Sequence, residues 1–216
     1  MLKHTIFQGI IDRGMVAIVR ADSANAALQL AEACIAGGMD ALEIAFTTPD
    51  TLDVIKRLRQ RHGDKVLLGA GTVLDTETAR LAILAGAKFI ISPNVNPDTI
   101  RICQRYQVLS MPGAMTPTEI LVALEAGADI VKVFPAEAFS PAYVKALRAP
   151  LPQAPLMPTG GVTLENLHQW FESGAVAVGI GGSLTGPAAK GDYNAVTAAA
   201  SAFVQRLADI RRQQPA

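Results

Sequence analysis

The sequence predicts an α/β protein in which eight parallel strands, each followed by a helix, close into a barrel. Short runs rich in Val, Ile and Leu recur along the 216 residues, and amphipathic segments separate them. A glycine also recurs where a helical pattern gives way to a strand, about once in every two strand–helix units. Half of the residues are hydrophobic, which is enough for a sizeable core.

The apolar runs are the expected strands. They do not alternate between apolar and polar residues, so we expect both faces of the sheet to be covered. The segments between them carry apolar residues three and four positions apart, as at 79–85 and 120–125, which is typical of helices. The expected strands span residues 15–20, 40–46, 66–72, 88–93, 108–112, 129–135, 154–160 and 176–182.

Four glycines support this number of strands. Gly38, Gly86, Gly127 and Gly174 each follow a helical pattern, at the position where glycine commonly ends a helix in the left-handed conformation. Each pair of successive glycines is separated by about two strand–helix units, so they should precede the second, fourth, sixth and eighth strands. Eight such units close as a (β/α)8, or TIM, barrel.

A doubly wound open sheet is the alternative arrangement of the same elements. Such a sheet usually has a glycine-rich turn after its first strand, whereas Arg20-Ala21-Asp22-Ser23 stands there in this chain. No linker or shift in composition divides the sequence. We therefore expect one α/β domain, a (β/α)8 barrel, over residues 1–216.

Composition narrows the class of function. The 19 basic and 19 acidic side chains cancel, so we expect no nucleic acid as a partner. No window approaches the ~20 apolar residues of a spanning helix, and no signal peptide is evident, so we expect no membrane partner. Cys34 and Cys103 have neither disulfide nor metal-ligand spacing, and the three histidines lie away from the strand ends. These features predict a cytoplasmic protein without a metal site.

Two charged residues stand inside apolar strands. Lys132 lies in Ile130-Val131-Lys132-Val133-Phe134, and Glu43 lies in Ala41-Leu42-Glu43-Ile44-Ala45. The lysine could sit at a strand rim with its head in water, or the two residues could form a structural ion pair. The functional alternative is a nucleophilic amine beside a carboxyl group that transfers protons, the combination that Schiff-base chemistry on a carbonyl requires.

The residues at the strand ends are the other candidates, because the active site of such a barrel lies at the carboxyl ends of its strands. Glycine pairs follow the seventh and eighth strands, where backbone N–H groups commonly bind phosphate, although flexible turns are the simpler interpretation. The candidates are Arg20, Thr72, Pro93, Thr159, Gly160, Gly161, Gly182 and Ser183.

These strand-end motifs resemble those of a known family. The motifs are Leu42-Glu43-Ile44, Gly69-Ala70-Gly71-Thr72-Val73, Ile91-Ser92-Pro93-Asn94, Lys132-Val133-Phe134-Pro135-Ala136, Pro158-Thr159-Gly160-Gly161-Val162 and Gly181-Gly182-Ser183. In this order they are similar to the motifs of the 2-keto-3-deoxy-6-phosphogluconate and 4-hydroxy-2-oxoglutarate aldolases. That family also includes the galactonate-series enzyme, and the resemblance covers about residues 11–211.

The resemblance implies a homotrimeric class I aldolase with no metal and no organic cofactor. It implies cleavage of 2-keto-3-deoxy-6-phosphogluconate to pyruvate and glyceraldehyde 3-phosphate, with Lys132 as the Schiff-base lysine and Glu43 as the acid and base. Thr72 and Pro93 would line the pyruvyl end, and Phe134 would pack the pocket. Thr159 would contact the hydroxylated part of the substrate. The phosphate would bind to Gly160, Gly161, Gly182 and Ser183.

The substrate series stays open. The phrase Pro158-Thr159-Gly160-Gly161 favours the gluconate series, whereas the segment 138–147 favours the galactonate series. The same chemistry on 2-keto-3-deoxy-6-phosphogalactonate or 4-hydroxy-2-oxoglutarate is therefore an alternative. A metal-free sugar-phosphate isomerase or epimerase is a more distant one, and a non-catalytic binding barrel would have no reason to bury both Glu43 and Lys132.

One position departs from the family pattern. Some members carry an arginine four residues after the acid, where it binds the pyruvate carboxylate, and this chain has Thr47 there. A carboxylate still requires N–H donors, and the first two strands are neighbours in a barrel. We hypothesise that Arg20 replaces the missing arginine.

Overall fold

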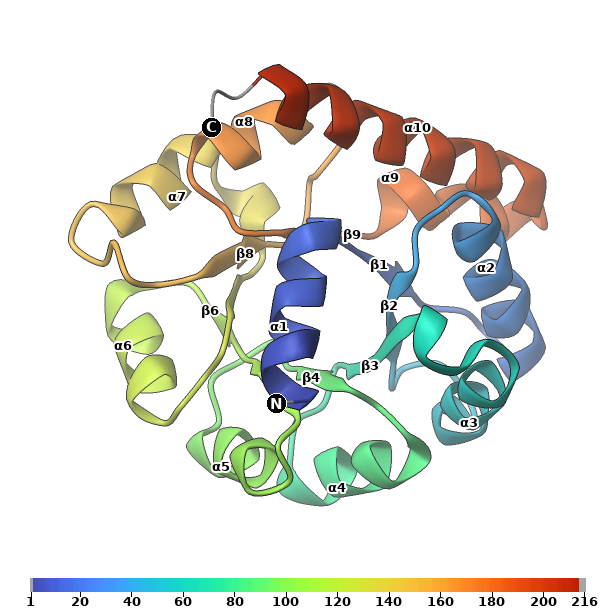
Figure 1. Ribbon diagram of the computed structural model, residues 1–216, viewed down its shortest axis with the longest axis horizontal. Coiled ribbons are helices and arrows are strands. Elements are labelled where there is room, and N and C mark those ends of the chain that lie inside the picture. The colour runs from blue at the N-terminus through green and yellow to red at the C-terminus, as the bar shows by residue number, and fades with distance from the viewer. Residues whose placement is uncertain (1, 214–216) are drawn as a thin grey trace.

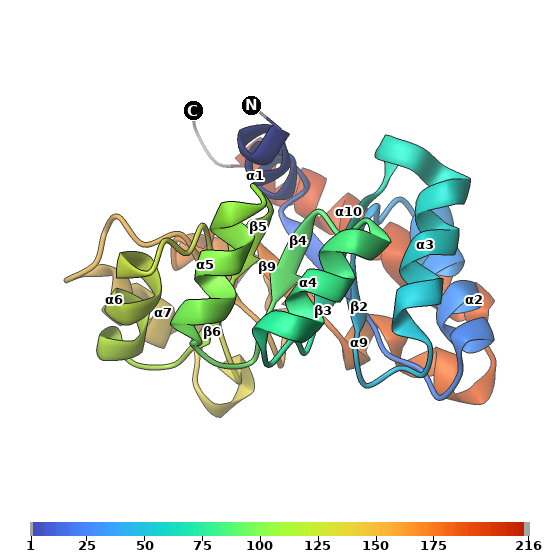
Figure 2. The same ribbon diagram turned by 90° about the horizontal axis from the view of Figure 1, so that it is seen from below.

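The computed structural model describes residues 2–213. Its strands form a ring that is surrounded by helices (Figures 1 and 2). The strands are β1 (Met15–Val19), β2 (Ala41–Ala45), β3 (Leu67–Gly71), β4 (Phe89–Ile91), β5 (Leu109–Met111), β6 (Gly113–Ala114), β7 (Val131–Val133), β8 (Leu156–Pro158) and β9 (Val178–Ile180).

The α-helices alternate with these strands, and the helix α1 precedes them all. They are α1 (Leu2–Arg13), α2 (Ala24–Ala36), α3 (Thr51–His62), α4 (Thr76–Ala85), α5 (Pro97–Arg105), α6 (Pro117–Glu125), α7 (Pro141–Arg148), α8 (Leu167–Glu172), α9 (Gly182–Thr185) and α10 (Tyr193–Gln213). Short 3₁₀ helices complete the connections: η1 (Gly63–Lys65), η2 (Ala136–Ala138) and η3 (Gly186–Lys190).

The strands pair in parallel and close into a barrel, which confirms the predicted fold class. Six pair in the order β5-β4-β3-β2-β1-β9 and three in the order β6-β7-β8, and a parallel bridge between Thr159 and Gly179 joins the two ends. The fifth expected strand, 108–112, corresponds to β5, and Pro112, which has no N–H to donate, separates β5 from the further short strand β6. There the chain changes partners: β5 pairs with β4, whereas β6 pairs with β7.

The four glycines that the sequence singles out do end helices. Their φ angles are +90° at Gly38, +109° at Gly86, +98° at Gly127 and +89° at Gly174. In each case the next residue donates its N–H to the carbonyl five residues earlier, at 2.9–3.2 Å, as in a Schellman motif. They lead into β2, β4, β7 and β9, which occupy the positions of the second, fourth, sixth and eighth expected strands.

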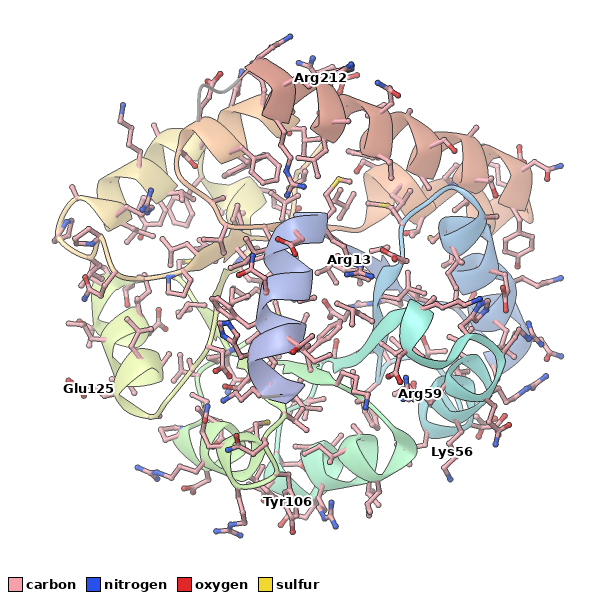
Figure 3. The ribbon with its side chains drawn as sticks, in the orientation of Figure 1. Arg13, Lys56, Arg59, Tyr106, Glu125 and Arg212 are labelled. Atoms are coloured by element: carbon pink, nitrogen blue, oxygen red, sulfur yellow. The ribbon has the colours of Figure 1, made fainter. Side chains whose placement is uncertain are left out.

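The helix α1 closes the amino-terminal mouth of the barrel, and the sequence patterns above do not predict it (Figure 1). Arg13 at its end donates two hydrogen bonds to Asp40, at 2.7 and 2.8 Å, just before β2 (Figure 3). Lys3 near its start forms an ion pair of 2.8 Å with Asp129, just before β7. Polar contacts thus attach both ends of α1 to the base of the strands.

The core has two layers. The larger lies between the strands and the outer helices. The smaller, which we call the inner cluster, fills the base of the barrel and includes two residues of α1. It consists of Ile6, Ile10, Val16, Ala41, Leu67, Phe89, Ile91, Leu109, Met111, Ile130, Met157 and Ala177. No helix in the described residues is long and apolar enough to span a membrane.

The inner cluster makes a stability prediction for α1. The side chain of Ile10 is fully buried in it, so Ile10→Ala should lower the free energy of unfolding by about 2–5 kcal/mol. Ile11, the next residue of the same helix, is only half-buried, so Ile11→Ala should cost less than half as much. Urea denaturation of the two variants measures the difference, and equal losses would contradict the role assigned to α1.

Candidate active site

The strands position the two charged residues inside the barrel. Alternate residues of a strand share a face, and Ile130 and Ala41 belong to the inner cluster. Lys132 and Glu43 stand two residues later on β7 and β2, so they also face the interior, nearer the carboxyl ends. Their exposed fractions are 5% and 1%, which excludes a lysine at the rim with its head in water.

The two charged groups are close but not hydrogen-bonded. The Nζ atom of Lys132 lies 3.8 Å from Oε1 of Glu43 and 4.9 Å from the centre of the Phe134 ring. Among the described residues, the buried Oε2 atom of Glu43 has no hydrogen-bond partner. A simple structural ion pair would leave this oxygen unsatisfied at a free-energy cost, whereas a ligand that donates a hydrogen bond would satisfy it.

Glycines on neighbouring strands make room for the polar side chains. A Cβ atom on Gly71 of β3 would lie 1.9 Å from Oε1 of Glu43. A Cβ atom on Gly179 of β9 would lie 2.4 Å from Oγ1 of Thr159, which is buried and has no hydrogen-bond partner within the part of the chain that the structure describes. Polar oxygens thus occupy space that any other residue type would fill at these two positions.

Thr72 and Pro93 follow β3 and β4 at the carboxyl end of the barrel. Thr72 has a φ angle of +58°, which is strained for a β-branched residue and is found mostly at functional sites. The carbonyl of Pro93 approaches Gly113 so closely that a Cβ atom there would lie 2.4 Å from it. Both residues follow the carboxyl ends of their strands, as the sequence predicts, but neither lines the large cavity described next.

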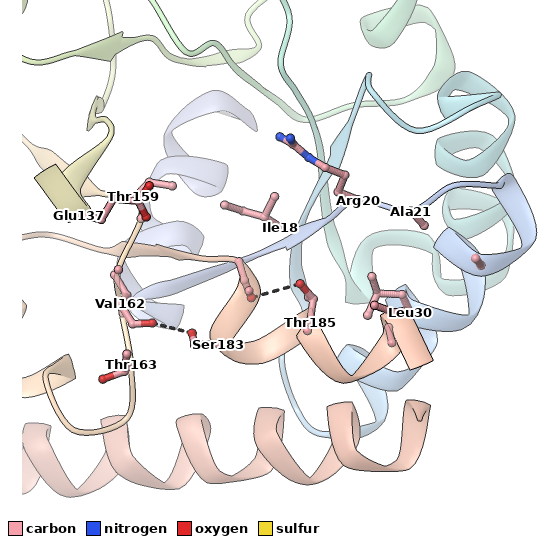
Figure 4. A pocket seen from close by; sticks show the side chains of 18 of the residues that line it. Ile18, Arg20, Ala21, Leu30, Glu137, Thr159, Val162, Thr163, Ser183 and Thr185 are labelled. Carbon is pink, nitrogen blue, oxygen red and sulfur yellow. Dashed lines mark hydrogen bonds between the residues drawn. The ribbon is translucent and has the colours of Figure 1, made fainter. Parts of the chain in front are cut away.

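A cavity of about 890 Å³ opens among the loops that follow β1, β7, β8 and β9 (Figure 4). Lys132 and Glu43 are not part of its lining. Lys132 lies two residues before the lining residue Phe134, and Glu43 pairs with Ile18, two residues before the lining residue Arg20, so both lie deeper in the barrel than those two residues. The structure brings seven of the sequence-predicted residues into this lining: Arg20, Phe134, Thr159, Gly160, Gly161, Gly182 and Ser183.

The glycine-rich turns after β8 and β9 meet along one side of the cavity. Gly160 and Gly161 have φ angles of +105° and +68°, which other residues rarely adopt. The hydroxyl of Ser183 donates a hydrogen bond of 2.5 Å to the carbonyl of Val162, so the turn after β8 is attached to α9 (Figure 4). The hydroxyl hydrogen of Ser183 is therefore used within the protein. A ligand at Ser183 would have to bind to its hydroxyl oxygen or its backbone N–H.

Arg20 lies at the end of β1, on the same strand face as Ile18, whose register partner on β2 is Glu43. Its exposed guanidinium has no hydrogen bond or ion pair with the described residues. In Figure 4 its side chain extends away from Ser183 and Thr185. The structure thus presents an unpaired cation to the cavity, two residues beyond the register partner of Glu43.

Glu137 also lines the cavity, although the sequence motifs do not indicate it. It lies in η2, one turn beyond the strand that carries Lys132, where no apolar run makes a charged residue conspicuous. The one feature of the sequence that could have indicated Glu137 is its position directly after the motif Lys132-Val133-Phe134-Pro135-Ala136. The described residues contain no cluster of three His, Cys, Asp or Glu side chains that could hold a metal ion.

Comparisons with known proteins agree with this geometry. A family model for the KDPG and KHG aldolases matches residues 8–199. The 2-dehydro-3-deoxy-6-phosphogalactonate aldolase of Escherichia coli K12 is 40% identical over 171 residues, or 79% of this chain and 83% of the relative. The 2-dehydro-3-deoxy-phosphogluconate aldolase of Treponema pallidum is 38% identical over 205 residues, or 93% of this chain and 97% of the relative.

A solved structure matches as well. It is that of a KDPG aldolase from Legionella pneumophila, with pyruvate captured at low pH as a covalent carbinolamine intermediate. Its TM-score is 0.81 at 26% sequence identity, and the match covers 93% of this chain and 97% of that one.

Proposed function

This chain belongs to the KDPG and KHG aldolase family, and we propose that its lyase reaction proceeds through a Schiff base on Lys132. The observation that carries the proposal is the buried Lys132 amine, 3.8 Å from an equally buried Glu43 carboxylate beneath an open cavity. The substrate we propose is 2-keto-3-deoxy-6-phosphogluconate, which the curated names write with 2-dehydro in place of 2-keto.

The first half of the reaction forms the covalent intermediate. The neutral amine of Lys132 attacks the C2 carbonyl of the keto acid and gives a carbinolamine. Loss of water from the carbinolamine gives an iminium ion, and this step requires a proton on the departing oxygen. Glu43 supplies that proton, since it is the carboxyl group next to Nζ.

The second half breaks the C3–C4 bond. The Glu43 carboxylate takes the proton of the C4 hydroxyl, the C3–C4 electron pair moves into the iminium, and glyceraldehyde 3-phosphate departs. The remaining enamine takes a proton on C3, and hydrolysis of the resulting iminium releases pyruvate and restores the amine. The unpartnered Oε2 atom of Glu43 is available for these transfers.

The other residues of the proposed site each contact a different part of the substrate. Thr72 and Pro93 contact the pyruvyl end, Phe134 packs against it, and Arg20 binds the carboxylate. Thr159 contacts the hydroxylated part through its buried, unpartnered hydroxyl. Backbone N–H groups at the two glycine turns, and at the start of α9, hold the phosphate through Gly160, Gly161, Gly182 and Ser183.

The C4 configuration is open between two series, because the curated relatives include both a galactonate and a gluconate aldolase, at 40% and 38% identity. The residue before the glycine pair, Thr159, favours the gluconate series. Cleavage of the galactonate epimer or of 4-hydroxy-2-oxoglutarate is the alternative. Family membership favours all of these over an isomerase, an epimerase or a non-catalytic barrel.

We also propose a homotrimer, which the family resemblance implies. Large apolar side chains are exposed on two outer helices, which lie on either side of α5 (Figure 2). They are Leu81 and Leu84 of α4, at 50% and 64%, and Leu121 and Val122 of α6, at 41% and 40%. Each helix thus exposes a pair of large apolar side chains, and exposed apolar residues that are not scattered singly are typical of a protein interface. A cytoplasmic location and a single domain over 1–216 stay predictions; residues 1 and 214–216 lie outside the described part.

Covalent trapping tests the Schiff base. Incubation with pyruvate and borohydride should attach one reduced pyruvyl group to Lys132, because the amine is positioned to form the iminium that borohydride reduces. Mass spectrometry with peptide mapping measures it. Lys132→Arg should abolish the adduct and lower turnover by roughly 10³-fold or more. Lys145→Arg, on the exposed face of α7, is the control, and an unmodified wild-type protein would overturn the mechanism.

Arg20→Ala tests the carboxylate contact. Loss of a charged hydrogen bond of about 1.5–3 kcal/mol should weaken apparent pyruvate affinity about 10- to 100-fold. The pyruvate concentration dependence of borohydride inactivation measures it. Arg57→Ala, an exposed arginine of α3, should leave the affinity unchanged. Equal affinities for wild type and Arg20→Ala would mean that another group replaces the arginine missing at position 47.

Sedimentation velocity tests the trimer. The wild-type chain should sediment as a trimer, and Leu84→Glu should shift it towards monomers because a charge would be buried at the interface. Ala202→Glu adds the same charge to the exposed face of α10 and should leave the trimer intact. A monomeric wild type would refute the proposal.

A further inference from the structure

Glu137 presents an unpartnered carboxylate to the cavity that we propose as the substrate site. It lines this cavity together with Phe134, Thr159, Gly160 and Gly161. Within the described part of the chain, it forms no hydrogen bond or ion pair. The proposed mechanism assigns it no task, because the proton transfers are made by Glu43.

The backbone beside Glu137, whose side chain is exposed, is attached to the turn after β8. The N–H of Ala136 donates a hydrogen bond of 2.9 Å to the carbonyl of Thr159, so η2 is attached to this turn. A Cβ atom on Gly160 would lie 3.1 Å from Oε2 of Glu137, and one on Gly161 would lie 3.0 Å from its Cβ. The carboxylate therefore lies against Gly160, beside Thr159 (Figure 4).

In the substrate orientation of the proposed function, this position lies beside the middle of the bound chain. Phe134, whose ring centre is 4.9 Å from the reactive amine, marks one end of the cavity, and Ser183 marks the proposed phosphate end. The substrate atoms that lie between the cleaved bond and the phosphate carry a hydroxyl group on C5. After cleavage this is the hydroxyl next to the aldehyde carbon of glyceraldehyde 3-phosphate.

We propose that Glu137 accepts a hydrogen bond from this hydroxyl and so selects aldehydes that carry it; this proposal rests on the proposed function. An ionised carboxylate only accepts hydrogen bonds, so it recognises a donor, and a hydroxyl is the donor that this part of the substrate offers. A phosphate group would be repelled by this carboxylate, so within the proposed phosphate site we expect the phosphate nearer to Gly182 and Ser183 than to Gly160 and Gly161, which both lie against Glu137.

Aldol synthesis from pyruvate tests the contact with two aldehydes, glyceraldehyde 3-phosphate and 3-phosphooxypropanal, which lacks the hydroxyl. Glu137→Ala should lower kcat/KM for glyceraldehyde 3-phosphate about 10- to 100-fold and leave the value for 3-phosphooxypropanal within about twofold. Glu137→Gln keeps a neutral acceptor and should lose less. Both kcat/KM values of a variant are measured on one preparation, so a loss of folded enzyme lowers both equally and leaves their ratio unchanged.

Three results would overturn the proposal: an equal loss with both aldehydes, no loss with either, or faster reaction with both, which would indicate that Glu137 only repels the phosphate. Glu172→Ala, at the exposed end of α8, removes the same charge outside the cavity and should leave the ratio unchanged.

Borohydride trapping with pyruvate alone separates a failure of the proposed function from a failure of the selectivity proposal. If wild type forms no adduct, the proposed function fails; if only Glu137→Ala fails to form it, Glu137 acts at the lysine end and the selectivity proposal fails.

Discussion

The placement of two charged side chains inside an apolar barrel is the constraint on which this site depends. The exposed fractions of Lys132 and Glu43 are only 5% and 1%, so both charged groups have lost most of the hydration that they would have in bulk water. Their separation of 3.8 Å offsets part of that cost but leaves a carboxylate oxygen unsatisfied. The fold holds this arrangement because apolar packing and parallel pairing on all sides stabilise the strands that carry it.

Small residues on the neighbouring strands complement these buried groups. Gly71 gives Glu43 its space, and Gly179 does the same for Thr159. Thr72, which has a strained φ angle, directly follows Gly71. The strained backbone and the glycines at the carboxyl ends thus lower stability there and provide the geometry of the site, whereas the amino-terminal base is packed with large side chains.

The sequence predicts the barrel, the parallel strands and the two buried charges because each has a local signal: an apolar run, a glycine at a helix end, or a charge inside a strand. The separation of β5 from β6 at Pro112 and the role of α1 depend on which segments pair or pack, which local patterns do not encode. Glu137 was missed for a related reason, since an acidic residue in a turn has no local signal until the fold places it against Gly160. The roles of the individual site residues stay predictions.

The helix α1 has a consequence for the order of binding. Because Ile6 and Ile10 fill the base of the barrel, we expect substrate to enter and both products to leave at the carboxyl ends of the strands. Lys132 lies deeper than the cavity residues that face the aldehyde half. If Lys132 forms the proposed Schiff base, the three-carbon acid occupies the inner position and the aldehyde the outer one. We then expect an ordered pathway, in which the aldehyde dissociates first in cleavage and the keto acid binds first in synthesis.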